Sequence, residues 1–152
     1  MCEKSVEDIL MAYSQDDLVS WRLADNNVTW DVPAWYEVKV IAAYSTFQQS
    51  LGYSRQDFYC ELLLGPVGEA EFEAQQPFKF EIRPGPYSWG LDHALIYKHN
   101  NIDKWLLFFE DLPFQISDRD YNDYVIEATK IPEATTIILL GAGFLLLSLK
   151  RQ

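Results

Sequence analysis

Residues 35–42 read Trp35-Tyr36-Glu37-Val38-Lys39-Val40-Ile41-Ala42, and this stretch decides the fold class. Tyr36, Val38, Val40 and Ala42 alternate with Glu37 and Lys39, which is the period of two expected for a β-strand with one buried face. The same alternation recurs twice downstream, with Phe58, Cys60, Leu62 and Leu64 against Tyr59 and Glu61, and with Phe78, Phe80 and Ile82 against Lys79, Glu81 and Arg83. The chain is therefore predicted to be mainly β.

Turn signals and further strand candidates extend this pattern over residues 35–130. Arg83-Pro84-Gly85-Pro86 is typical of a turn, and strands are expected at 94–97, 105–109 and 124–128. Short strands with such punctuation predict an antiparallel β-sandwich, jelly-roll-like in its topology. Residues 1–34 are an N-terminal extension or part of the sandwich. Within 5–22, Ser5 followed by Glu7 and Asp8 indicates a helix cap and a short N-terminal helix.

Composition limits the classes of protein that fit. The chain has 152 residues, 49% of them hydrophobic, which suits one domain with a real core. It carries 23 acidic against 12 basic residues and a net charge of -11, which argues against a nucleic-acid partner because phosphate binding needs a basic face. Two cysteines, Cys2 and Cys60, are too few for a disulfide-stapled scaffold.

The C-terminal tail, residues 131–152, differs from the rest of the chain. No charge occurs from Thr135 to Leu149, and Lys150 and Arg151 follow at once. Fifteen helical residues span about 22 Å, which is marginal for a hydrocarbon core of about 30 Å. Apolar residues cover every face of this helix, as in a membrane span or a deeply buried terminal helix. We expect a membrane helix whose basic end is cytoplasmic, with residues 1–131 on the outer side.

The order of parts in this tail resembles a PEP-CTERM sorting signal. Pro132 and Glu133 match the start of the motif, Lys150 and Arg151 match its basic end, and Ala134 replaces the second Pro. The apolar helix between them carries the expected Leu and Gly residues, among them Leu140, Gly141 and Gly143. The resemblance implies an exosortase, an integral membrane transpeptidase-like enzyme, as processing partner and a location in the cell envelope or outside the cell. Residues 1–8 lack the basic start and apolar core of a signal peptide, so we expect an N-terminus that is missing from this chain.

An acidic segment just before the tail holds the only concentrated chemistry. Five carboxylates and one asparagine lie within fourteen positions: Glu110, Asp111, Asp118, Asp120, Asn122 and Asp123. Their oxygens are the ligands that calcium prefers, and Asp118, Asp120 and Asn122 at steps of two are similar to the first half of an EF-hand loop. Asp123 and Thr129 stand where that loop needs Gly and Glu, so an EF-hand is excluded. A calcium site and a solvated Asp-rich turn, in which Arg119 pairs with the carboxylates, both remain open.

The same segment resembles the end of domain of unknown function 4114. Phe109-Glu110-Asp111-Leu112 and the run Asp118 to Asp123, followed by a strand, match that family's pattern, although Ile116-Ser117 replaces its Gly-Gly turn. Upstream, Gln49-Ser50-Leu51-Gly52-Tyr53 is similar to its Asn-Ser-Phe-Gly-Tyr stretch. The resemblance covers residues 35–130 and implies no established activity.

Three classes of function fit these features. A non-catalytic exported surface or matrix protein is favoured. A carbohydrate-binding module, with extracellular polysaccharide as partner, would use exposed tryptophans from the set Trp30, Trp35, Trp89 and Trp105. A hydrolytic enzyme would need paired carboxylates, for which Glu69, Glu71 and Glu73 on one strand are weak candidates. The spacing of His93 and His99 suits no zinc site.

Overall fold

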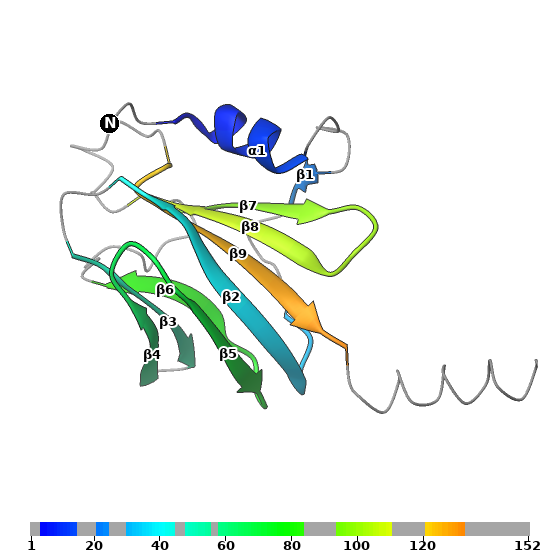
Figure 1. The fold of residues 1–152 in the computed structure, drawn as a ribbon. Coiled ribbons are helices and arrows are strands. Elements are labelled where there is room, and N and C mark those ends of the chain that lie inside the picture. The colour runs from blue at the N-terminus through cyan, green and yellow to red at the C-terminus, as the bar shows by residue number, and fades with distance from the viewer. Residues whose placement is uncertain are drawn as a thin grey trace, which may run out of the picture.

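The computed structural model describes residues 4–14, 21–24, 30–44, 48–55, 58–83, 94–110 and 121–132. These residues are mainly β, with antiparallel strands and one short helix (Figure 1). In chain order the elements are α1 (Val6–Ser14), β1 (Trp21–Leu23), β2 (Ala34–Ala43), β3 (Ser50–Arg55), β4 (Phe58–Leu64), β5 (Glu69–Ala74), β6 (Lys79–Arg83), β7 (Ala94–His99), β8 (Lys104–Phe109) and β9 (Tyr124–Ile131). The mainly β prediction is therefore confirmed for this part of the chain.

Two sheets pack on a common core. Within the described residues, one has six strands in the order β1-β7-β8-β9-β2-β5, and the other has three in the order β4-β3-β6. Every strand pair is antiparallel. Sheets of six and three strands differ from the two four-stranded sheets expected of a jelly roll.

Strand β2 shows the alternation that its sequence predicts. Tyr36 and Val38 are fully buried, whereas Glu37 and Lys39 are exposed. The alternation ends after Val40, where a shift in the β2–β9 register marks a bulge. Ala42 consequently packs on the opposite face of the sheet, next to α1.

The alternation predicted for β4 is wrong. Phe58 and Leu64 are exposed by 63% and 61%, although the pattern placed them on the buried face. The β3–β4 register shifts between Leu51 and Gly52, and the extra residue that this adds to β4 turns Leu64 away from the core. Phe58 pairs with Arg55 at the other end of β4 and is exposed there, although it shares a face with Cys60, the register partner of Tyr53. In β6 the prediction holds for Phe80 and Ile82, which are buried.

Aromatic rings fill the space between the sheets. Trp30 lies just before β2, and the centroids of four rings lie 4.8–5.6 Å from its own: Tyr36, Phe78, Phe80 and Trp105. Edge-to-face and offset contacts of this kind stabilise a core beyond the area that they bury. Both sheets contribute to this cluster, which is the main evidence that they form one sandwich.

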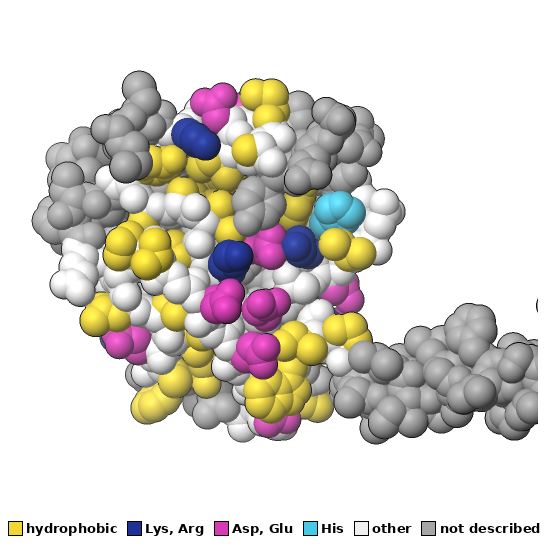
Figure 2. Space-filling model, in the orientation of Figure 1, with side chains coloured by type: hydrophobic (Ala, Val, Ile, Leu, Met, Phe, Trp, Pro, Cys, Tyr) yellow, Lys and Arg dark blue, Asp and Glu magenta, His cyan; other side chains and the backbone are white. Residues whose placement is uncertain are grey.

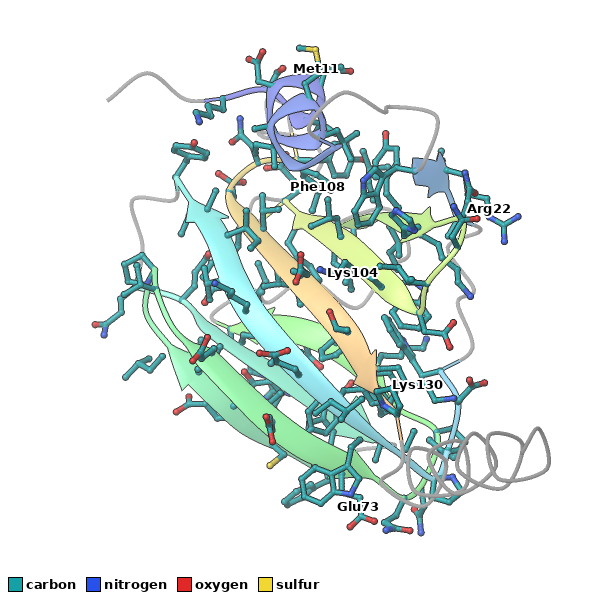
Figure 3. All side chains as sticks on the ribbon, turned by 45° about the vertical axis from the view of Figure 1, so that its right-hand side comes forward. Met11, Arg22, Glu73, Lys104, Phe108 and Lys130 are labelled. Carbon is teal, nitrogen blue, oxygen red and sulfur yellow. The ribbon has the colours of Figure 1, made fainter. Side chains whose placement is uncertain are left out.

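A second core lies under the helix. Val6, Ile9 and Leu10 of α1 pack on Leu106, Phe108 and Val125, and Figure 3 shows Phe108 directly beneath the helix. The predicted cap is confirmed: Ser5 Oγ accepts from Asp8 N at 3.2 Å, and Ser5 N donates to Asp8 Oδ2 at 3.3 Å. The helix expected within 5–22 is shorter than that range, because Trp21–Leu23 pairs with β7 as strand β1.

One buried chain of hydrogen bonds ties the two sheets together. The Tyr124 hydroxyl donates to Gly65 O at 2.7 Å, and Gly65 N donates to Gln49 O at 2.8 Å. Burial raises the pKa of Tyr124 to about 12, so its hydroxyl keeps the donated proton at physiological pH. The start of β9 is therefore fixed against the β4–β5 turn and the residue that precedes β3.

Gly52 is required by close packing in the three-stranded sheet. A Cβ at this position would lie 2.5 Å from Cζ of Tyr59 and would also strike the carbonyl oxygen of Cys60. We expect Gly52→Ala to lower the free energy of unfolding of the full chain by about 2–3 kcal/mol, because a backbone oxygen cannot move aside as a side chain can. Chemical denaturation measures the change.

Ser54→Ala, two residues along the same strand, serves as the control and should cost less than about 0.5 kcal/mol. If Gly52→Ala is as stable as the wild type, then Tyr59 and Cys60 of β4 do not lie as close to Gly52 as described.

Candidate functional site

The candidate site lies where the acidic segment leaves β8 and enters β9. Phe109 and Tyr124 are the last paired residues of these strands, and Glu110 and Asp123 come next on each. Asp123 O accepts from Tyr44 N at 2.9 Å, and Asn122 Nδ2 donates to Lys4 O at 3.1 Å. The acidic corner, by which we mean Glu110, Asn122 and Asp123, is thus fixed by the residue that follows β2 and by Lys4, two residues before α1.

Glu110 is the most unusual side chain of the corner. It is only 4% exposed, and neither of its carboxylate oxygens has a hydrogen-bond partner among the residues that the structure describes. Within the described residues no Lys or Arg forms an ion pair with it. An ionised carboxylate buried without a partner costs several kcal/mol of stability in principle, and a bound cation would offset that cost.

Asn122 has a structural role at the same corner. It is buried, and its side-chain nitrogen is committed to α1 through Lys4 O. An amide held in this way can offer a cation only its oxygen. Tyr121 just before it has φ of 54°, a left-handed conformation that is uncommon for a residue other than glycine. This turn of the backbone directs Asn122 toward the helix.

The structure describes half of the six predicted ligands. Glu110, Asn122 and Asp123 meet at the corner, whereas Asp111, Asp118 and Asp120 lie outside the described residues. Among residues that the structure describes, no group of three or more His, Cys, Asp or Glu side chains could hold a metal. The corner alone is therefore an incomplete coordination shell, and calcium binding there depends on oxygens from 111–120.

A second polar cluster lies on the outer face of the three-stranded sheet, and the sequence did not reveal it. The Tyr59 ring lies over Gly52, its hydroxyl is 3.1 Å from Ser50 Oγ, and the Arg83 guanidinium lies 4.0 Å above the ring. Arg83 Nε also pairs with Glu81 Oε1 at 2.9 Å, and Glu81 is 8% exposed. The alternating pattern predicted that Glu81 faces solvent. The only sign of burial in the sequence was that Arg83, two residues later, carries the opposite charge.

The Gln49–Tyr53 stretch owes its composition to this packing. Gln49, Ser50 and Leu51 are buried, and Gly52 provides the space for the Tyr59 ring. The polar groups of the Tyr59 cluster bind one another, so the cluster offers a ligand little that is unsatisfied.

The remaining candidates separate by burial. Trp30 and Trp105 belong to the sandwich core, Trp35 is exposed, and Trp89 lies outside the described residues. Glu69, Glu71 and Glu73 are exposed on β5, and Glu71 lies opposite Glu37 of β2. His99 Nδ1 accepts from Asn101 N at 3.2 Å, and His93 lies outside the described residues.

Most of the predicted sorting tail also lies beyond what the structure describes. Pro132 is exposed at the end of β9. The other tail residues singled out by the sequence are outside the described ranges: Glu133, Thr135, Leu140, Gly141, Gly143, Leu149, Lys150 and Arg151. Within those ranges, α1 is the only helix, and no helix there has the length and hydropathy to span a bilayer.

No protein-family model, no curated protein and no solved structure matches this chain. The resemblances to PEP-CTERM tails and to domain of unknown function 4114 therefore have no support beyond the residues that suggested them. The function must be inferred from the chemistry of the described residues and from the sequence of the tail.

Glu110 and Glu81 form a matched pair for testing the cost of a buried carboxylate. In buffer with a chelator that removes calcium, we expect Glu110→Gln to raise the free energy of unfolding by about 1 kcal/mol, because burying a neutral amide costs less free energy than burying an unpaired charge. Glu81→Gln should instead lower it, because Arg83 loses its ion-pair partner. Urea unfolding of both variants measures the difference, and a loss of stability in both would mean that Glu110 has a compensating partner within the protein.

Proposed function

We propose that this chain is a non-catalytic β-sandwich module of a cell envelope. Its C-terminal tail holds it at a membrane, and calcium bound at the acidic corner stabilises it. The resemblance to a PEP-CTERM signal adds an exosortase as the processing enzyme. The buried, unpartnered carboxylate of Glu110 is the observation that carries the calcium part of this proposal.

The chemistry of the corner favours a hard cation over an internal partner. Calcium binds six to eight oxygens from carboxylates, amides and carbonyls. Glu110 directly follows β8 and Asp123 directly precedes β9, so both carboxylates flank the Phe109–Tyr124 pair. Asn122 adds an amide oxygen. Asp111, Asp118 and Asp120 supply three more carboxylates within the connecting segment. Without a cation, so many acids in one short segment repel one another.

The direction of β9 supports the membrane part of the proposal. The strand ends at Ile131, and the charge-free run begins only four residues later at Thr135. Pro132 is exposed, and its missing N–H favours the end of a strand. A run of fifteen uncharged residues needs an apolar environment, and a membrane supplies one.

Among the described residues, Trp35 is the one candidate tryptophan that is exposed, and it lacks a second exposed tryptophan beside it there. A sugar-binding face uses exposed aromatic platforms, but Trp30 and Trp105 fill the core. A hydrolase needs a pair of carboxylates in a cleft, whereas the β5 glutamates lie on an open sheet face (Figure 2). Figure 2 shows acidic and basic side chains close to one another on the face turned to the viewer, as on an ordinary solvated surface.

Calcium should raise the melting temperature of the full-length chain in detergent. For a dissociation constant of roughly 0.1–1 mM, several millimolar calcium adds about 0.5–1.5 kcal/mol, or a few degrees. Asp118→Asn combined with Asp120→Asn should abolish this shift. Glu71→Gln combined with Glu73→Gln changes the charge equally but should leave the shift intact. A melting temperature that stays the same from chelator to several millimolar calcium would decide for the solvated turn and against a metal.

The tail should determine membrane association. We expect the full-length chain to fractionate with membranes and a chain lacking residues 132–152 to remain in the supernatant. Leu140→Lys should weaken association, because a lysine at the centre of a membrane helix costs about 3 kcal/mol on insertion. Gly141→Ala is the neutral control. The proposal fails if the truncated chain sediments with membranes as fully as the intact one.

A further inference from the structure

The end of the sandwich from which β9 leaves carries exposed apolar side chains on three neighbouring elements. Ile131 is the last residue of β9, and Trp35 of β2 is its register partner. On the other side of β9, Lys130 N donates to Asp103 O at 2.9 Å, which places the β7–β8 turn and its Ile102 beside the end of β9. We call Trp35, Ile102, Ile131 and Pro132 the tail-side rim.

The rim is contiguous. Trp35 is 45% exposed and Ile102 is 52% exposed, both high for large apolar residues. Single exposed apolar residues are common and need no explanation. These residues, however, belong to β2, β9 and the turn before β8, and strands β8, β9 and β2 are consecutive in the six-stranded sheet. Adjacent strands lie about 4.8 Å apart, so the side chains form one apolar edge.

The length of the connection to the tail limits how far the rim can be from a membrane. From Ile131 to Thr135 there are four residues, which reach at most about 14 Å when fully extended. The headgroup layer on each side of a bilayer is about 5–8 Å thick. If residues 135–149 enter the hydrocarbon, the rim cannot lie far above the headgroups.

We propose that the tail-side rim rests in the headgroup layer of the membrane that the tail enters, with Trp35 as its anchor. This proposal rests on the membrane part of the proposed function. Tryptophan is enriched at membrane interfaces, because its ring is largely apolar and its N–H remains hydrogen-bonded in the wet layer. Ile102 and Ile131 add apolar area beside it.

The charges around the rim select the kind of lipid. Lys130 Nζ donates to Asp31 Oδ2 at 2.7 Å and holds the pKa of Asp31 below its usual value, and Lys98 lies 3.5 Å from Asp103. Glu73, the register partner of Trp35, is a further exposed acid beside the rim. A chain with a net charge of -11 is repelled by an anionic surface, so a zwitterionic phosphatidylcholine surface is the occupant that fits.

Figure 3 gives the geometry of a test. Lys130, next to Ile131, lies low in that view, whereas Met11 lies on the far side of α1, at the top. Met11 is 50% exposed, close to the 52% of Ile102, so the two positions can carry matched probes.

The experiment uses the full-length chain in vesicles of phosphatidylcholine with brominated acyl chains, which quench nearby tryptophans. Flotation first shows whether the chain is attached. We expect the lipid-quenched emission of the wild type to be lost in Trp35→Phe. In the Trp35→Phe background, Ile102→Trp should restore the quenched emission, and Met11→Trp should not.

Each other outcome overturns the proposal in a distinct way. The chain could float with the vesicles while its lipid quenching is the same with and without Trp35. The tail would then be in the membrane and the tail-side rim would lie away from the membrane. Trp35 could instead be shielded from aqueous iodide without being quenched by lipid. That result would mean that a second copy of the chain covers the tail-side rim. A chain that does not float removes the proposed function and the rim proposal together.

Discussion

Strand β8 buries side chains on both of its faces, and the rest of the structure depends on that constraint. Trp105, Leu107 and Phe109 face the aromatic core between the sheets, whereas Leu106 and Phe108 face the opposite side. A strand that is apolar on both faces must be covered on both, because exposed side chains of this size would lose their burial energy. The three-stranded sheet covers one face, and α1 covers the other.

Because β8 is covered on both faces, the polar groups where β8 ends and β9 begins are buried as well. Tyr124 points into the core and can be buried only because its hydroxyl reaches Gly65 O. Asn122 is buried between strand and helix, where it donates to Lys4 O. Glu110 follows the end of the doubly covered strand and is also buried, but its carboxylate has no partner in the described part of the chain. The same end of the sandwich thus contains the Tyr124 hydroxyl, which has its hydrogen-bond partner, and the Glu110 carboxylate, which has none among the described residues. This contrast is the reason to infer a bound cation.

The two ends of the sandwich have different chemistry. The acidic corner lies where β9 begins, and the tail-side rim lies where β9 ends, so the eight residues of this strand separate them. An eight-residue strand is about 27 Å long. A module that stands on its apolar rim would present its acidic corner to the medium, where extracellular calcium is available. The proposed anchoring and the proposed metal site are therefore compatible in one orientation.

The sequence by itself determined the features that repeat locally. The period of two predicted β2 and the buried face of β6, and Ser5 with Asp8 predicted the start of α1, because backbone geometry sets both patterns within a few residues. Sequence also placed Glu110, Asn122 and Asp123 in one acidic segment. Only the tertiary structure decided which of these groups is buried, and only it decided that Phe58 and Leu64 of β4 face solvent. The orientation of Leu64 depends on a bulge against β3, and burial on the other face of the six-stranded sheet depends on α1, which covers a strand about a hundred positions away in the sequence. Such pairings are set by contacts between distant segments, which no local period encodes.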